Sequence, residues 1–567
     1  MDENPAIRFS AAGRRPWARS ACAVLALLVA GGCTTSLRQW WHNGWKVGPN
    51  YCPPQAAVSQ QWLDAADQRL QATSADDQAW WTVFSDPALD RLVQTAYRQN
   101  LDLKTAGTRI LASRAERGIA VGNLFPQRQT AVADYVHAQI PSGSGFPLPI
   151  PSPLNLWATG FNASWELDFW GRFRRAIESA DANLGASIEA YHDAVLLLVS
   201  EVATNYVQLR TYEQRLEFAR RNVEIQVGSL GLAEDRFHNG VVSELDVRQA
   251  RSNLAQTRAL IPPLEAGRRQ AGNRLCILLG VPVEDLARQL EPAPIPQPPL
   301  TVAVGIPADL LRRRPDIRRA ERLVAAQSAQ IGIAEAQLYP QFAINGFIGY
   351  AANDLADLFN SKSFVGFIIP TFSWNVLNYG RIRNNVREQQ AMLQETVFQY
   401  QQTVLTAGRE VEDALVGFLQ ARQQAEFLES GVGEAERSVE LVTLQYRGGI
   451  VDFNRVFTTQ QLLVQQQDQL ASTRGNIALN LVQVYRALGG GWRAFEHGGQ
   501  AQAAVAPASA LPPLPAAEPV APPGPTVPPV PPPPAAAAPA PGTGPILNVR
   551  ATSVGRQVEH VAERPVR

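Results

Sequence analysis

The amino-acid sequence predicts a mainly α-helical protein with membrane β-strands, built from an internally duplicated chain. Three observations lead to this fold class. The chain repeats itself once, each repeat holds a helical pattern far longer than a compact domain needs, and each repeat also holds segments that alternate between apolar and polar residues. Together these features are typical of a structure that joins a membrane to the compartment beside it.

The duplication is visible as identical residues at a constant spacing. Five pairs, each separated by 209 positions, are Gly171 and Gly380, Glu201 and Glu410, Gly240 and Gly449, Val247 and Val456, and Gly280 and Gly489. Upstream, Pro126 and Pro340 are 214 positions apart. The five-residue difference falls in the span that holds a Pro/Gly/Ser-rich loop at 141–153. Because loops absorb changes of length and packed elements do not, this spacing indicates two copies of one unit.

The repeats divide the chain into six predicted segments. They are a signal peptide (1–32), a lipid-anchored N-terminal segment (33–83), repeat 1 (84–290), a Pro-rich linker (291–306), repeat 2 (307–493) and a Pro/Ala-rich tail (494–567). We expect the tail to be disordered, because it has too few large apolar residues to offset the entropy lost on ordering.

The amino terminus has the pattern of a secretory signal. Arginines precede an apolar run at 21–30, and Gly31-Gly32 stand directly before Cys33. The run is shorter than the ~20 residues of a transmembrane helix. Small residues before a cysteine resemble the lipobox of bacterial lipoproteins, which implies a covalent lipid on Cys33; an ordinary signal peptide with an incidental cysteine is the alternative. Thr34 resembles the residue that follows the cysteine in lipoproteins sorted to the outer membrane.

Composition argues against several classes of function. The 51 basic and 51 acidic side chains balance, so no global field favours nucleic acid. The four cysteines and six histidines follow no metal-site spacing, and the sequence contains no phosphate-binding loop, dinucleotide fingerprint or nucleophile elbow. We therefore expect no enzyme, no metal site and no cofactor apart from the lipid.

A long coiled-coil helix is the clearest element of each repeat. Apolar residues at alternating steps of four and three predict a buried seam, and they are Val195, Val199, Val202, Tyr206, Leu209, Leu216, Val223, Val227 and Leu230. The second copy has Val404, Val411, Leu415, Phe418, Val432 and Val439. About 65 residues of helix would measure about 100 Å at ~1.5 Å per residue. Pro262-Pro263 predict a break in the returning helix.

Strands form the second element of each repeat. From Trp157 to Phe169 the odd positions are mostly large and apolar, and the even positions are small or polar. Its 13 residues exceed the ~9–11 that cross a bilayer. Further strands are predicted at 127–137, from Phe342 to Tyr350, and at 363–374. Four strands cannot close a membrane barrel, so strands in a membrane would require oligomerisation.

Several local motifs resemble the TolC-like outer-membrane efflux factors, in their lipoprotein (NodT-like) branch. They are Trp80-Trp81-Thr82-Val83-Phe84-Ser85-Asp86-Pro87, Arg313-Arg314-Pro315-Asp316-Ile317, Leu124-Phe125-Pro126-Gln127 and Leu338-Tyr339-Pro340-Gln341. The resemblance implies a homotrimer in which four strands per chain make a twelve-stranded β-barrel, continuous with a periplasmic α-barrel of long helices. It also places Pro126 and Pro340 at the joints between helix and β-barrel.

The resemblance further implies that the helical turns are periplasmic tips, which gate the channel and dock an adaptor protein. The candidate residues are Gly240, Ser243, Leu245, Asp246, Gly449, Asp452 and Arg455. Asp246 matches a constriction aspartate of the family, whereas Arg455 stands at the corresponding position of the second tip. Our hypothesis is that Asp246, Asp452 and Arg455 hold the resting tip shut. The simpler interpretation is a plain turn between helices.

The sequence thus predicts an outer-membrane channel subunit of a tripartite efflux system, lipid-anchored and extending into the periplasm. Its expected partners are two further copies of the chain, a periplasmic adaptor (membrane fusion protein), an inner-membrane pump and outer-membrane lipid, with no nucleic acid. The alternatives are a type I protein-secretion duct, a structural coiled-coil envelope lipoprotein and a passive porin, of which the porin fits the long heptads poorly.

Overall fold

The computed structural model describes residues 35–71, 79–139, 153–286, 290–299 and 301–495, all within one compact unit. The predicted signal peptide, Cys33 and all but the first two residues of the predicted tail lie outside the described residues.

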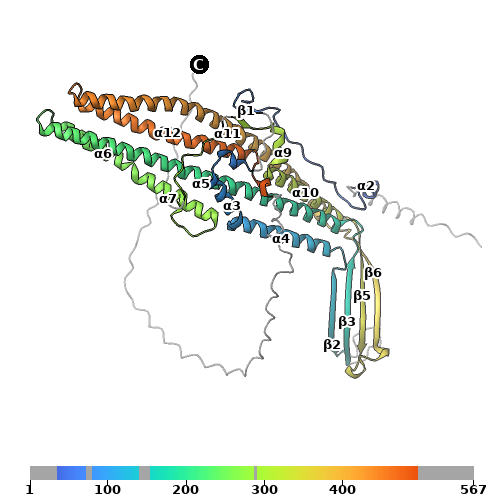
Figure 1. The fold of residues 1–567 in the computed structure, drawn as a ribbon. Coiled ribbons are helices and arrows are strands. Elements are labelled where there is room, and N and C mark those ends of the chain that lie inside the picture. Colours follow the sequence, from blue (N-terminus) through green and yellow to red (C-terminus); the bar gives the residue numbers. More distant parts are fainter. Residues whose placement is uncertain (1–34, 72–78, 140–152, 287–289, 300, 496–567) are drawn as a thin grey trace, which may run out of the picture. The chain divides into compact units, whose positions relative to one another are not determined.

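Two very long helices, one from each repeat, dominate the fold (Figure 1). Helix α5 spans Arg172–His238 and helix α11 spans Arg381–Arg447, each with 67 residues, as the heptads predicted. Both begin after a glycine in the left-handed conformation, Gly171 at φ 80° and Gly380 at φ 82°. A residue without a Cβ reaches this conformation without steric cost, so the repeated glycine marks where each helix begins.

The two long helices return in different ways. After α11 the chain returns as one unbroken helix, α12 (Phe453–Ala487). After α5 it returns as α6 (Glu244–Ala259) and α7 (Ile261–Leu279), which meet at Leu260. Pro262 and Pro263 stand in the first turn of α7, where a missing N–H costs nothing, and they prevent α6 from continuing. The predicted break is confirmed.

Shorter elements surround the long helices. Repeat 1 contributes η1 (Trp80–Phe84), α3 (Pro87–Gln99) and α4 (Leu101–Gly122), and repeat 2 contributes η2 (Pro307–Asp309), α9 (Leu310–Arg313) and α10 (Pro315–Ala336). Helix α4 packs on α5, and α10 packs between α5 and α11. The first described helix, α2, spans Leu37–His42, and η5 spans Trp492–Phe495. Among the helices of the described ranges, none combines the length and apolar character that crossing a bilayer requires.

A two-stranded parallel sheet, which the sequence analysis did not predict, joins the N-terminal segment to the linker. Strand β1 (Leu70–Gln71) comes from the N-terminal segment, and strand β4 (Val302–Ala303) comes from the Pro-rich linker. Val302 is buried in the main core, so this end of the linker is fixed to the body of the protein.

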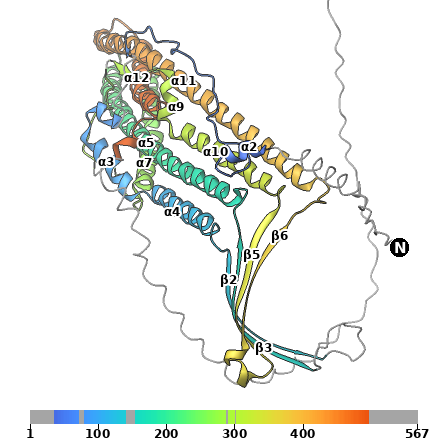
Figure 2. The same cartoon turned by 90° about the vertical axis from the view of Figure 1, so that its right-hand side faces the viewer.

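Four longer strands form one antiparallel sheet in the order β2-β3-β5-β6. They are β2 (Arg128–Ala138), β3 (Leu154–Glu166), β5 (Gln341–Ala352) and β6 (Phe364–Ser373). Each repeat supplies one hairpin, and β3 and β5 join the hairpins. Strand β2 follows α4 and β5 follows α10, whereas β3 and β6 lead into α5 and α11 (Figure 2). Two short 3-10 turns, Leu355–Asp357 and Ser361–Ser363, lie between β5 and β6.

The predicted count of four strands is confirmed, but β3 begins and ends three residues before the predicted span of 157–169. The strand begins earlier because Leu154–Leu156 pair with residues 136–138 of β2. It ends earlier because Asp168 caps helix α5 instead of extending the strand. Its carboxylate accepts hydrogen bonds from the backbone N–H groups of Phe173 at 2.9 Å and Arg174 at 3.0 Å. An acidic side chain at this place satisfies N–H groups that a helix start leaves unpaired.

The core is largest where the helices pack around residues 195–209 of α5 and 404–419 of α11. The predicted seam of α11 is buried throughout, but the seam of α5 is buried only as far as Leu216. Beyond it Val227 is 46% exposed, and Asn222, Gln226 and Ser229 are buried in its place. Asn222 and Ser229 face α12 there, through hydrogen bonds with Gln467 and Gln460. The buried stripe of this part of α5 therefore follows α12 and not the heptad frame that starts at Val195.

Candidate functional site: the sheet and the helical tip

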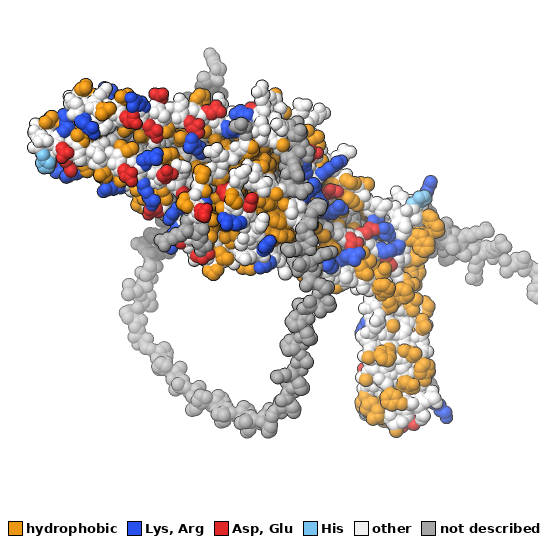
Figure 3. Space-filling model, viewed as in Figure 1, with side chains coloured by type: hydrophobic (Ala, Val, Ile, Leu, Met, Phe, Trp, Pro, Cys, Tyr) orange, Lys and Arg blue, Asp and Glu red, His pale blue; other side chains and the backbone are white. Residues whose placement is uncertain are grey.

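The four-stranded sheet has one face that is apolar across all strands. Strand register places the following large side chains on that face: Tyr135, Trp157, Phe161, Trp165, Phe342, Ile344, Ile348, Tyr350, Phe364, Ile368 and Phe372. Many are exposed, including Phe161 at 66% and Ile368 at 76%. Hydrophobic side chains are visible along the strands in Figure 3. An exposed apolar band of this extent fits contact with lipid or with another protein.

The opposite face of the sheet is mixed. Ser164 donates to Asn345 Oδ1 at 2.7 Å, and Asn345 donates to Thr371 Oγ1 at 3.1 Å, so a hydrogen-bonded row crosses three strands. Strand β6 is the exception to the alternation, because Phe367 and Ile369 make its second face apolar as well. Both β2 and β6 are edge strands, and each leaves one row of backbone N–H and C=O groups without a partner strand among the described residues.

The structure places Pro126 between α4 and β2, and Pro340 between α10 and β5. Both prolines thus stand where a helix passes into a strand, and we call these two places the joints. Indole N–H groups satisfy carbonyls at both joints. Trp165 donates to the carbonyl of Leu124 at 3.2 Å, and Trp170 donates to the carbonyl of Pro340 at 2.7 Å. Because a proline cannot continue the helix, these tryptophans pair backbone groups that the turn leaves free.

The predicted tips are tight turns at the ends of the long helices. Gly240 and Gly449 have φ of 72° and 73°, so both copies need a residue without a Cβ. Ser243 precedes α6 without a side-chain capping bond, and Leu245 is 62% exposed. Asp452 caps α12 by accepting the backbone N–H of Arg455 at 3.2 Å.

Four side chains clasp the two tips of one chain to each other; we call Arg236, Asp246, Tyr446 and Phe453 the tip clasp. The Tyr446 hydroxyl donates to Asp246 Oδ2 at 3.0 Å. Arg236 lies over the Tyr446 ring at 4.9 Å and donates to the carbonyls of Tyr446 and Arg447. Phe453 packs edge-on against Tyr446 with ring centroids 5.4 Å apart. The tip clasp therefore joins both helices of the repeat 1 hairpin, α5 and α6, to repeat 2.

Electrostatics reinforce this contact. Burial, followed by the hydrogen bond to the Asp246 carboxylate, raises the pKa of Tyr446. The phenol therefore keeps the proton that it donates throughout the physiological range.

Of the three residues of our gating hypothesis, Asp452 and Arg455 meet through the cap of α12, and within the described residues neither makes a hydrogen bond or ion pair with Asp246. Asp246 bonds to Tyr446, Asp452 caps its own helix, and Arg455 is exposed. Within the described ranges the Arg455 guanidinium makes no hydrogen bond or ion pair. The sequence reasoning missed Arg236 and Tyr446, although both lie in the stretches beside the glycine turns. Their partners are 200 or more positions away, which no local pattern reveals.

Between the tip and the main core, buried amides replace apolar side chains. Asn222 donates to Gln467 at 2.6 Å, and Gln467 donates to Glu436 at 2.8 Å. Closer to the tip, Gln460 donates to Ser229 at 2.7 Å and accepts from Asn253 at 3.0 Å. We call these two groups the amide layers, and each links side chains from both repeats.

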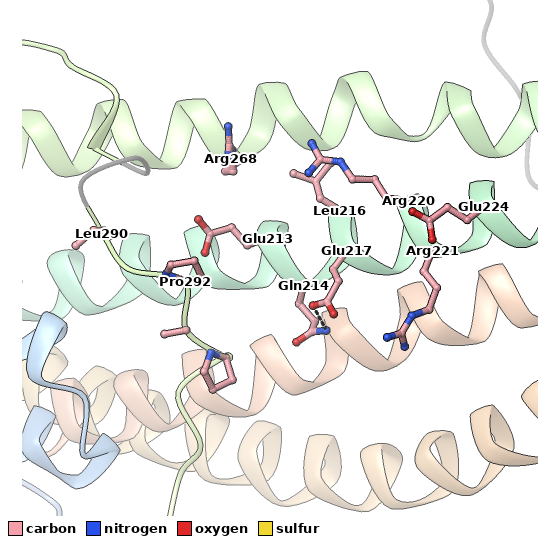
Figure 4. A pocket seen from close by; sticks show the side chains of 12 residues that line it. Glu213, Gln214, Leu216, Glu217, Arg220, Arg221, Glu224, Arg268, Leu290 and Pro292 are labelled. Carbon is pink, nitrogen blue, oxygen red and sulfur yellow. Dashed lines mark hydrogen bonds between the residues drawn. The ribbon is translucent and has the colours of Figure 1, made fainter.

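A groove of about 730 Å³ lies beside α5, and Pro292 of the linker and Arg268 of α7 also line it (Figure 4). Its walls carry both charges, and the lining side chains include Glu213, Glu217, Arg220, Arg221, Glu224 and Arg268. Gln214 donates to Glu217 at 3.2 Å inside it. Among the described residues no group of three or more potential ligands lies close enough to hold a metal ion.

The chain is similar to known outer-membrane export proteins over most of its length. The family model "Outer membrane efflux protein" matches residues 92–281 and 306–490. A nodulation protein T of Rhizobium leguminosarum bv. viciae is 30% identical, covering 79% of this chain and 91% of the relative. The pyoverdine export outer membrane protein OpmQ of Pseudomonas putida is 32% identical, covering 78% and 94%.

A solved structure agrees with the sequence comparisons. The outer-membrane channel OprN is 31% identical and superposes with a TM-score of 0.75, covering 79% of this chain and 99% of that chain. The predicted TolC-like fold, the NodT-like relationship and the role as an outer-membrane efflux channel are confirmed. The chain therefore belongs to the outer membrane efflux protein family.

Proposed function

We propose that three copies of this chain form a channel that carries solutes from an inner-membrane pump and a periplasmic adaptor out through the outer membrane. The four-stranded sheet, apolar on one face and open at both edges, carries this proposal. In lipid, unpaired backbone groups on β2 and β6 would each cost several kcal/mol, so the edges must pair with neighbouring chains. Three sheets of this size supply twelve strands, enough to close a barrel.

The tip clasp is the proposed gate. It fastens the two tips of one chain together, so that each chain keeps its helical end in the resting position. An Asp246→Ala variant loses the acceptor for the Tyr446 hydroxyl, and we expect a higher single-channel conductance and greater sensitivity of the host cell to antibiotics. An unchanged conductance in a correctly assembled trimer would refute this role of Asp246.

The tip surface is the proposed docking site for the adaptor. Besides Ser243, it presents three exposed apolar side chains, with Val241 at 61%, Leu245 at 62% and Ile450 at 76% exposure. Exposed apolar side chains at two matched turns fit a protein partner better than they fit water. A spacer lipoprotein, one of the alternatives, would need neither these tips nor the sheet.

The lipid on Cys33 also remains a proposal. Mass spectrometry of the mature protein tests it: we expect an acylated cysteine at the new amino terminus, absent from Cys33→Ser. Cleavage elsewhere, or an unmodified Cys33, would contradict it.

In-cell photo-crosslinking tests the proposed function as a whole. A photoreactive amino acid replaces Ser243 at the tip, and a matched probe replaces Ser361 in the exposed turn between β5 and β6, at the opposite end of the sheet. We expect the Ser243 probe to trap an adaptor and the Ser361 probe to trap none. The trapped adaptor's pump then identifies the substrate class and separates solute efflux from protein secretion. Failure of the Ser243 probe to trap any adaptor, in cells where the trimer assembles, would contradict the proposal.

A further inference from the structure

Five aromatic side chains gather where the N-terminal segment meets the base of the sheet. They are Trp40, Trp41, Trp45, Phe169 and Trp170, and we call them the tryptophan cluster. Trp40 is central, with ring centroids 5.5 Å from Trp45, 5.3 Å from Phe169 and 5.5 Å from Trp170. Trp41 adds a contact to Trp45 at 5.6 Å.

The cluster is exposed on its outer side. Trp41 is 63% exposed, Trp45 46% and Phe169 40%, although aromatic rings of this size usually bury most of their area. The rings also continue onto the apolar face of the sheet. Phe169 lies 5.4 Å from Phe342, which lies 5.5 Å from Phe372 on the neighbouring strand. The cluster therefore extends the apolar face of the sheet toward the helices.

The backbone that carries Trp45 is fixed in an unfavourable conformation. Trp45 has φ of 63°, a left-handed conformation that is unfavourable for a residue with a Cβ. Arg174 holds it there, by donating to the carbonyls of Gly44 at 2.6 Å and Trp45 at 2.8 Å. Asp168, itself 7% exposed, positions the Arg174 guanidinium at 2.9 Å. The start of α5 thus holds the exposed indole in place.

Charge in the segment around the cluster has one sign. Residues 35–50 include Arg38 and Lys46 and contain no aspartate or glutamate. Lys46 pairs with Glu178 of α5, and Arg38 is exposed on α2 beside the tryptophans. Cations next to aromatic rings suit the region where lipid phosphates meet the acyl chains, because indoles place an apolar body in the acyl region and an N–H toward water.

We propose that the tryptophan cluster is an interfacial anchor, which inserts Trp41 and Trp45 into the headgroup region of the membrane leaflet at the helical end of the sheet. This inference rests on the proposed insertion of the sheet into the outer membrane. The ring contacts from Trp45 through Phe169 to Phe342 place the cluster at the edge of the apolar face, where a leaflet that surrounds the sheet would end. The anchor fixes how deep the sheet sits, independently of any lipid on Cys33.

Spin-label accessibility of the full-length protein in phosphatidylethanolamine–phosphatidylglycerol vesicles tests the anchor. Single cysteines replace Trp41, Trp45 or His42 in a Cys52→Ser background, since Cys52 is the exposed native thiol of the described residues. His42→Cys leaves every ring of the cluster intact, so the test survives if a tryptophan variant fails to assemble. Ile368→Cys on the sheet and Val241→Cys at the tip are the lipid and water controls.

We expect the ratio of oxygen to polar-reagent accessibility at positions 41, 42 and 45 to be several-fold higher than at position 241. Labels at 41 to 45 that match position 241 would overturn the anchor, and so would labels shielded from both reagents, which would indicate a covering protein chain. When positions 41 to 45 give an overturning result, position 368 decides how far the failure extends. A water-like ratio at 368 would refute the proposed membrane insertion of the sheet as well. A lipid-like ratio at 368 would refute the anchor alone.

Discussion

The same arrangement of three side chains occurs both in the main core and at the tip. In each place a tyrosine hydroxyl donates to an aspartate, and an arginine lies over the tyrosine ring. In the core, the Tyr206 hydroxyl donates to Asp86 Oδ2 at 2.6 Å, and Arg210 lies 5.0 Å from the ring. At the tip, the corresponding distances around Tyr446 are 3.0 Å and 4.9 Å. Both tyrosines are buried, and burial raises the pKa of both.

The surroundings of the two tyrosines differ. Tyr206 belongs to one continuous apolar cluster that includes Leu209, Leu415 and Phe418. Tyr446 belongs to a small cluster of seven buried residues, and other small clusters and the amide layers separate it from the main core. Because stability follows the apolar area buried, the tip half of the hairpins should open at lower free energy than the core half. The same local arrangement is thus a structural contact in the main core and the proposed gate at the tip.

The largest expected effect compares two buried leucines. Leu415→Ala should cost about 4–5 kcal/mol, the upper part of the range for such changes, because the continuous core cannot collapse around the cavity. Leu463→Ala should cost about 2–3 kcal/mol, because among the described residues its small cluster consists of Ala435 and Val439, with Ile225 partly buried against them. Chemical unfolding of the detergent-solubilised trimer measures both. Equal costs would show that the two halves are packed alike.

Replacing each tyrosine by phenylalanine removes only the hydroxyl. A hydrogen bond to a carboxylate contributes roughly 1.5–3 kcal/mol, so both Tyr206→Phe and Tyr446→Phe should destabilise the segment around them by that order. Hydrogen exchange should localise the two losses differently. We expect faster exchange near Tyr446 to stay within the tip half, and Tyr206→Phe to affect the core. Spread of the Tyr446→Phe effect into residues 195–209 would contradict two separable halves.

A single substitution in an amide layer should lower the stability of the protein, and a second substitution at its partner should restore most of it. Asn222→Leu leaves a Gln467 carbonyl buried and unpaired, at a cost of about 1–3 kcal/mol. Adding Gln467→Leu removes that carbonyl, and the double variant should recover most of the loss, as a double-mutant cycle would show. The double variant should also have a lower open probability, because its two leucines would extend the apolar packing of the main core toward the tip. A double variant as unstable as the sum of the singles would contradict this account of the layer.

The smallest expected effect is a pH dependence at alkaline pH. The raised pKa of Tyr446 means that the folded tip binds the hydroxyl proton more tightly than the unfolded chain does. Its contribution to stability is complete below the ordinary tyrosine pKa of 10.0 and declines as the pH rises above it. Exchange at the tip should therefore accelerate more steeply above that pH in the wild type than in Tyr446→Phe. Parallel pH profiles would contradict the assignment.

Much of the fold followed from the sequence, because its strongest signals are local or periodic. Heptads predicted both long helices, and Pro262-Pro263 predicted the break between α6 and α7. The strand count also held. The end of β3 was misplaced because Asp168 serves the following helix, a choice that depends on its fit to Arg174 and not on alternation.

The site was less predictable, for a physical reason. The glycine turns and Asp246 are marked by repetition and by resemblance to a family. The partner of Asp246 is 200 positions away in the other repeat, and the partners of the tryptophan cluster are similarly remote. The burial of Asn222 depends on which helix faces α5 at that point, here α12 through Gln467, and a seven-residue pattern does not report this. These contacts therefore depend on long-range packing, which periodic patterns in the sequence do not report.

Single-channel recording in planar bilayers tests the central claim, that the clasp at the tip is the gate and its counterpart in the core is not. Tyr446→Phe and Tyr206→Phe remove the same hydroxyl from the same arrangement in the two regions. We predict a higher conductance for Tyr446→Phe and an unchanged conductance for Tyr206→Phe, in trimers of normal yield. Unchanged conductance in both variants, or an equal increase in both, would contradict the account.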